Sequence, residues 1–148
     1  MAKNPTDIDV LNQVTQTLID SHKGYEMAYQ MIEDHEDLRT ILAERSAERL
    51  ALVARFQKAV VERGGEPETN GTPLGVMHRG VVKVSRLFQS NLYAALTAID
   101  DGEIYLMDEV EDRLKLTTLS PETRHLLNIA LDSAIDGDAF AGATAHAA

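Results

Sequence analysis

The chain has 148 residues, a formal net charge of −10 at pH 7 and no cysteine. This length suits one domain with a sizeable hydrophobic core, and the missing cysteines exclude disulfides and zinc–thiolate sites. The negative charge disfavours nucleic acids and anionic membrane surfaces as partners, because both would repel it. The first residues lack the apolar core of a signal peptide, and no apolar run is long enough to span a bilayer. We therefore expect a cytoplasmic protein with no nucleic-acid or membrane partner.

The first predicted helix begins at a capping signal, Thr6 or Asp7, and runs to about Glu33. Its apolar residues recur every three or four positions, which is typical of one buried helix face: Leu11, Val14, Leu18, Tyr25, Ala28 and Ile32. Ser21 and His22 interrupt this stripe at its middle. The break at residues 34–37 is short, so the next helix should return antiparallel to the first.

The second predicted helix runs from about Asp37 to Arg63 and ends at Gly64-Gly65, since glycine commonly follows a helix C-terminus. Its apolar face passes through Arg45 and Arg49, and it is otherwise built from Leu38, Leu42, Leu52, Phe56 and Val60.

Residues 64–76 are rich in glycine and proline and form a connector, not a helix. Thirteen extended residues reach about 43 Å, whereas a helix of some 27 residues is about 40 Å long. The connector can therefore run the length of a bundle and start the third helix at the opposite end. A shorter helical piece from Val76 to about Ser90 is expected before it.

The third long helix, from Leu92 to about Lys115, carries one carboxylate where its apolar spacing asks for another apolar side chain. Glu103 stands in the stripe formed by Leu92, Leu96, Ile99, Leu106, Val110 and Leu114. Ser120-Pro121-Glu122 marks the start of a last helix, which we expect to fade near Gly137.

Together these elements predict an all-α protein, a ferritin-like four-helix bundle with a long crossover between helices 2 and 3. The alternative is an up-and-down bundle with a flexible second loop. One domain should span residues 1–148, with frayed tails at 1–6 and 138–148.

Several short motifs resemble a bacterial ferritin-like four-helix-bundle family of unknown function, often described as stress-associated structural proteins. They are Gly24-Tyr25, then Gly64-Gly65-Glu66-Pro67 with Gly71 and Gly75, then His78-Arg79-Gly80, and last Asp100-Asp101-Gly102-Glu103. The resemblance covers about residues 7–136 and implies a ferritin-like fold without an established reaction. The sequence departs from a metal-binding pattern at Gln30 and Arg55, where ferritin-like proteins would place acidic residues.

Three interpretations of the middle of the bundle remain open, because helix midpoints lie at one level when helices pack side by side; in the last of them, the carboxylates are exposed and unpaired. In the first, Glu103 pairs with Arg49 or Arg45, and His22 bonds to neighbours such as Ser21 or Tyr25. In the second, a metal centre uses the ligands Glu103, His22, Glu26 and Glu48, with iron or manganese bound. The pair Glu122 and His125 has the spacing of a metal motif but stands at the start of the last helix, about 15 Å from that level.

We expect a non-enzymatic ferritin-like helical protein without a cofactor, with a structural or stress-related role that the resemblance alone implies. Apolar and aromatic residues outside the predicted seam favour self-association into a homo-oligomer: Tyr29, Met31, Leu50 and Val53. The alternative is a metal-dependent oxidase or metal store built on the mid-bundle carboxylate and histidine. A third possibility is an adaptor that presents its acidic face to a basic protein partner.

Overall fold

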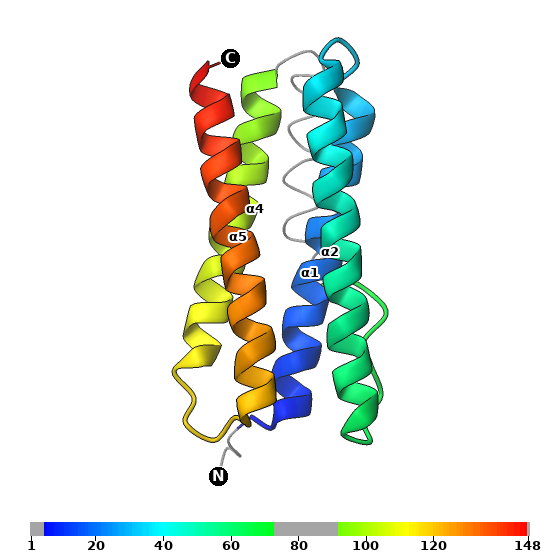
Figure 1. The fold of residues 1–148 in the computed structure, drawn as a ribbon, viewed down its shortest axis with the longest axis vertical. Coiled ribbons are helices and arrows are strands. Elements are labelled where there is room, and N and C mark those ends of the chain that lie inside the picture. Colours follow the sequence, from blue (N-terminus) through cyan, green and yellow to red (C-terminus); the bar gives the residue numbers. More distant parts are fainter. Residues whose placement is uncertain (1–4, 73–91, 148) are drawn as a thin grey trace.

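A computed structural model of the chain describes residues 5–72 and 92–147, and most of these residues lie in long helices. The helices are α1 (Asp7–Met31), α2 (Glu36–Glu62), α4 (Leu92–Leu114) and α5 (Pro121–Ala147). They lie side by side with their long axes roughly aligned (Figure 1). The prediction of an all-α four-helix bundle is confirmed. The piece expected from Val76 to Ser90 lies outside the described residues.

The bundle consists of two antiparallel helix hairpins, α1 with α2 and α4 with α5, which make the most extensive contacts. Between the hairpins, α1 contacts α4 more closely than α2 contacts α5. α2 and α4 run in the same direction, so α4 begins at the end of the bundle opposite to the end of α2 (Figure 1). This is the direction that the predicted lengthwise crossover requires.

The described part of the connector, residues 63–72, follows α1 along the bundle. Asn12 Nδ2 donates to the Glu66 carbonyl at 3.0 Å, and its Oδ1 accepts from the Glu68 amide at 2.9 Å. Two turns further along α1, the amide of Thr72 donates to Asp20 Oδ2 at 3.2 Å. Residues 63–72 therefore run along the bundle and do not fold back over its end.

The residues predicted to cap the helix ends do so in the structure. Thr6 and Asp9 form a capping box at the start of α1, and Gly64, with a φ of 80°, follows the end of α2. At the start of α5, Ser120 Oγ accepts from the amide of Thr123 at 3.3 Å. These caps satisfy amide groups that a helix end leaves without partners.

One carboxylate joins three helix ends at that side of the bundle. Asp7 Oδ2 accepts from the Ser120 amide at 3.1 Å and from Thr123 Oγ1 at 2.5 Å, and it lies 3.4 Å from Arg63 Nη2. Partial burial alone would raise the pKa of Asp7, but these hydrogen bonds and the Arg63 charge outweigh it and lower the pKa. The charged Asp7 side chain therefore connects the start of α1 to the end of α2 and the start of α5.

The apolar interior is divided into two clusters along the bundle axis. The larger cluster includes Leu18, Phe56 and Leu106, and the smaller one includes Tyr25, Leu42 and Leu96. A polar layer lies between the two, at the level of Ser21, Arg49, Glu103 and Ser133, and all four of these residues are buried. This layer is the candidate site.

The prediction that the last helix fades near Gly137 is wrong, and so is the expectation of frayed residues from 138 onward as far as 147. α5 continues to Ala147. Ala141 and Ala145, four residues apart, are buried in the smaller apolar cluster. Alanine gives a weak hydrophobic signal in a sequence, but it has the highest helix propensity and allows close packing. None of the helices in the described ranges is both long and apolar enough to cross a bilayer.

Candidate functional site: a buried arginine–glutamate pair

Arg49 of α2 and Glu103 of α4 form an ion pair in the centre of the bundle, and both side chains are 0% exposed. Arg49 Nη1 donates to Glu103 Oε1 at 2.6 Å, and Nη2 donates to Oε2 at 2.5 Å. The planar guanidinium matches the two carboxylate oxygens in this geometry, and such paired, charge-assisted hydrogen bonds are about twice as strong as neutral ones. The carboxylate that interrupts the stripe of the third helix is thus neutralised by a cation of the same chain.

The remaining donors of Arg49 reach the other two helices. Nη1 also donates to Ser21 Oγ of α1 at 2.5 Å, Nε donates to Ser133 Oγ of α5 at 3.0 Å, and Nη2 donates to the Ser133 carbonyl at 3.0 Å. The hydroxyl of Ser133 in turn donates to Glu48 Oε1. One guanidinium therefore bonds side chains of α1, α4 and α5 to α2, and its N–H groups are fully used.

A glycine of α5 makes room for the carboxylate. A Cβ atom placed on Gly137 would lie 1.6 Å from Glu103 Oε2 and 2.9 Å from the hydroxyl of Tyr25. The Tyr25 ring lies beneath the Arg49 guanidinium, with 5.5 Å between the guanidinium carbon and the ring centroid. Among the described residues, the buried Tyr25 hydroxyl has no hydrogen-bond partner of standard geometry.

Burial and pairing act in opposite directions on the two charges. Burial raises the pKa of Glu103, and the hydrogen bonds and charge of Arg49 oppose this rise. Burial would lower the pKa of Arg49, but the hydrogen bonds and charge of Glu103 reverse the direction and raise it. Arg49 therefore stays a cation, and its two donated hydrogen bonds fit an ionised Glu103.

The structure places Arg45 and His22 outside this pair. Arg45 Nη2 donates to the Asp136 carbonyl at 3.3 Å, and its guanidinium carbon lies 5.0 Å from the Phe140 ring centroid. Of the two cations on the inward face of α2, Arg49 is therefore the partner of Glu103.

His22 bonds across to α2. Its Nδ1 lies 2.9 Å from both the carbonyl and the hydroxyl oxygen of Ser46, and its Nε2 lies 3.5 Å from Glu26 Oε2. The expectation that His22 bonds to Ser21 or Tyr25 is wrong, because its ring points between the helices of the first hairpin and not along its own helix.

The four residues considered as metal ligands form two sets: Glu103 and Glu48 both contact Arg49, whose Nε lies 3.8 Å from Glu48 Oε1, and His22 lies beside Glu26. Glu103 is bound by Arg49, His22 by Ser46, and Glu48 accepts from Ser133, while the Glu26 side chain is 54% exposed. Within residues 5–72 and 92–147, no group of three or more histidine, aspartate or glutamate side chains is arranged to hold a metal ion.

Sequence reasoning missed a second buried acid, Asp20 of α1, which is 3% exposed. Its Oδ2 accepts from both the amide and the hydroxyl of Thr72, the latter at 2.5 Å. A Cβ atom on Gly71 would lie 2.0 Å from Asp20 Oδ1, so only glycine fits at this point of the connector. The sequence offered two signals for this contact: an aspartate beside the apolar stripe of the first predicted helix, and a glycine in the predicted crossover.

Two acidic side chains, Asp100 of α4 and Asp138 of α5, face each other. Burial and the neighbouring carboxyl of Asp138 raise the pKa of Asp100 to about 7.

A cavity of about 10 Å³ lies between Gly24 of α1 and Gly102 of α4, beside Tyr25 and Glu103. That volume suits at most one water molecule, so this layer has no room for an organic ligand.

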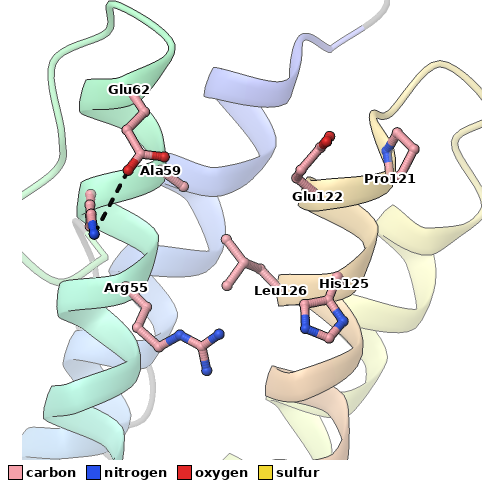
Figure 2. Close-up of a pocket in the computed structure, with 8 residues that line it drawn as sticks. Arg55, Ala59, Glu62, Pro121, Glu122, His125 and Leu126 are labelled. Atoms are coloured by element: carbon pink, nitrogen blue, oxygen red, sulfur yellow. Dashed lines mark ion pairs between the residues drawn. The ribbon is translucent and has the colours of Figure 1, made fainter.

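A wider groove lies between α2 and α5, near the start of α5 (Figure 2). Its volume is about 510 Å³, and Arg55 extends from α2 toward His125 of α5. The charges along it are largely paired: Lys58 lies 3.9 Å from Glu62, and Glu122 lies 3.8 Å from Arg63. Glu122 and His125, which have the spacing of a metal motif, thus line an open, solvated groove far from Glu103.

A family model described as a domain of unknown function (DUF2383) matches residues 6–116. The chain belongs to this family. The DUF2383 match includes Arg49 and Glu103, whereas Ser133 and Gly137 of α5 lie beyond its end. No curated protein and no solved structure matches the chain.

Proposed function

We propose that this DUF2383 protein is a non-enzymatic, ferritin-like helical protein of structural or stress-related role, which acts without a cofactor as a self-associated assembly in the cytoplasm. The ferritin-like relation is supported by the lengthwise crossover between α2 and α4 and by the resemblance of the glycine-rich motifs. The stress-related role follows from that resemblance alone.

The proposal rests on the identity of the groups that fill the polar layer. Bundles with di-iron centres build them at mid-height from inward-facing carboxylates and histidines. At that height, this chain has the Arg49 guanidinium bound to both oxygens of Glu103. A metal bound to Glu103 would have to displace the cation and leave it buried without a partner, at a cost of several kcal/mol.

The pair also explains how a structural protein benefits from a buried charge. Replacing such a pair by apolar residues is often neutral or stabilising, so its presence is not accounted for by stability alone. Its donors bind all three neighbouring helices at one level, which fixes the register of the two hairpins. We infer that the layer specifies one arrangement of the bundle.

Metal analysis tests the proposal against its alternative, an iron- or manganese-dependent oxidase or metal store. The protein is purified without chelator, incubated with Fe²⁺ or Mn²⁺, desalted and analysed by mass spectrometry of the metals. We expect substoichiometric metal that is the same in Glu103→Ala and in the exposed control Glu122→Ala. Stoichiometric metal that is lost only in Glu103→Ala would overturn the proposal.

Self-association rests on apolar side chains at the surface. Leu50 is 52% exposed, whereas Val53, expected outside the seam, is 4% exposed and belongs to the core. Tyr29 is covered by Arg39, whose guanidinium carbon lies 4.3 Å from the ring centroid. Leu50 is therefore the residue of the predicted set that best supports an interface. Light scattering at micromolar concentration should give a mass above that of one chain, and a strict monomer would remove self-association from the proposal.

A further inference from the structure

The outward face of α2 carries exposed apolar side chains. They follow a four-and-three spacing along the helix, and all are exposed: Ala43, Ala47, Leu50, Ala54 and Val61. Leu50 and Val61 are 52% and 57% exposed. The core residues of α2, such as Leu42 and Phe56, lie on another side of the helix and are 0% exposed. We call these five residues the α2 stripe. Such a spacing is typical of the seam between two paired helices.

When two copies of α2 run antiparallel, the large side chains of one α2 stripe can lie opposite small side chains of the other. If Leu50 packs over Ala54 of an antiparallel second copy, the same register places Val61 over Ala43 of that copy. Each large side chain then meets a small one, which allows the two helices to approach closely. At the remaining position of the spacing, the Gln57 amide donates to the Glu68 carbonyl at 2.8 Å, so the connector borders the stripe.

The charges beside the stripe fit the same register. Glu44 and Lys58 follow Ala43 and Gln57 by one position, on the flank of the stripe away from the core, and both are exposed. Antiparallel pairing with Leu50 over Ala54 brings Glu44 of each copy to Lys58 of the other. A parallel two-fold pairing would instead place Glu44 and Lys58 of the two copies on opposite sides of the contact, so neither of these attractions would form. Within its own chain, Lys58 makes one exposed ion pair at 3.9 Å, with Glu62.

We propose that two copies of this chain associate through an antiparallel contact of their α2 stripes, in the register that pairs Glu44 with Lys58 across a two-fold axis. This inference names the surface for the self-association included in the proposed function and rests on it. The contact is isologous, so it closes as a dimer and uses the same residues on both sides.

A charge-reversal experiment tests the register. Sedimentation velocity is run over a concentration series on the wild type, on Glu44→Lys, on Lys58→Glu, and on an equimolar mixture of the two variants. Each variant alone should dimerise roughly tenfold more weakly, because two exposed attractions become two repulsions by symmetry. The mixture should regain wild-type association, because one chain then offers two lysines and the other two glutamates.

Two controls separate this contact from other effects. Glu111→Lys makes the same charge change on the exposed face of α4 and should leave dimerisation unchanged, whereas Leu50→Glu should abolish it. Circular dichroism of each variant verifies that the helices remain folded. If the wild type self-associates but the charge variants match it, this surface is wrong while self-association stands. A wild type that stays monomeric throughout the series overturns both.

Discussion

Adding a single methyl group at Gly137 tests whether the Arg49–Glu103 pair is held in place by the surrounding helices. In Gly137→Ala, the new Cβ atom would lie 1.6 Å from Glu103 Oε2 and 2.6 Å from its Cδ atom, so the carboxylate has to move. The end of a glutamate side chain usually moves easily. Here it is 0% exposed and bound at both oxygens by Arg49, so moving it breaks the pair.

The expected magnitude is the difference between two effects. Breaking a buried ion pair costs about 3–5 kcal/mol, because a charge is left buried without its partner. Replacing glycine by alanine inside a helix contributes about 1 kcal/mol in the opposite direction. We therefore expect Gly137→Ala to lower the free energy of unfolding by about 2–4 kcal/mol.

Urea denaturation followed by circular dichroism measures this free energy, and Gly142→Ala on the same helix is the matched control. A Cβ atom on Gly142 would lie 4.0 Å from the Asp100 oxygens, an ordinary contact, so this variant should gain up to about 1 kcal/mol. If Gly137→Ala proves as stable as Gly142→Ala, the polar layer is not tightly packed and the reasoning fails.

Two other predictions concern acids away from the pair. Asp20→Ala should lower the free energy of unfolding by about 1–3 kcal/mol, because the Thr72 donors lose their common acceptor, and it should speed cleavage by a glutamate-specific protease at Glu66 and Glu68. An unchanged cleavage rate relative to the exposed control Asp101→Ala would show that Asp20 does not hold the connector. Since the pKa of Asp100 is raised from 3.8 to about 7, the folded protein binds this proton more tightly than the unfolded chain, and wild-type stability should fall as the pH rises from about 4 to 7. Asp100→Asn should flatten that dependence and be more stable than the wild type above pH 7, and parallel melting-temperature curves between pH 4 and 8 would contradict this.

The helices and their order could be predicted from the sequence because their signals are local. The caps at Thr6 and Ser120, the glycines after α2 and the apolar spacing each act within a few residues. The length of the connector was sufficient to favour the crossover. The misfit of Glu103 in an apolar stripe likewise required a partner, and only two cations, Arg45 and Arg49, lay on the facing stripe.

The details of the polar layer could not be predicted because they depend on the rotation and depth of each helix. Arg45 and Arg49 are one turn apart, and only the packed bundle distinguishes the partner of Glu103 from the residue that binds the Asp136 carbonyl. Gly137 resembles a helix end in the sequence, yet it is the space that the carboxylate fills. Asp20 and Thr72 are 52 positions apart and meet only because the connector follows α1.

The most direct measurement of the central claim, that Arg49 neutralises Glu103, is a double-mutant cycle of Arg49→Met and Glu103→Leu in urea denaturation. Each single variant leaves one buried charge without its partner and should lose about 3–5 kcal/mol, whereas the double variant should lose far less than the sum, with a coupling above about 2 kcal/mol. Losses in the two single variants that simply add in the double variant would show that the two side chains do not depend on each other, which contradicts the account.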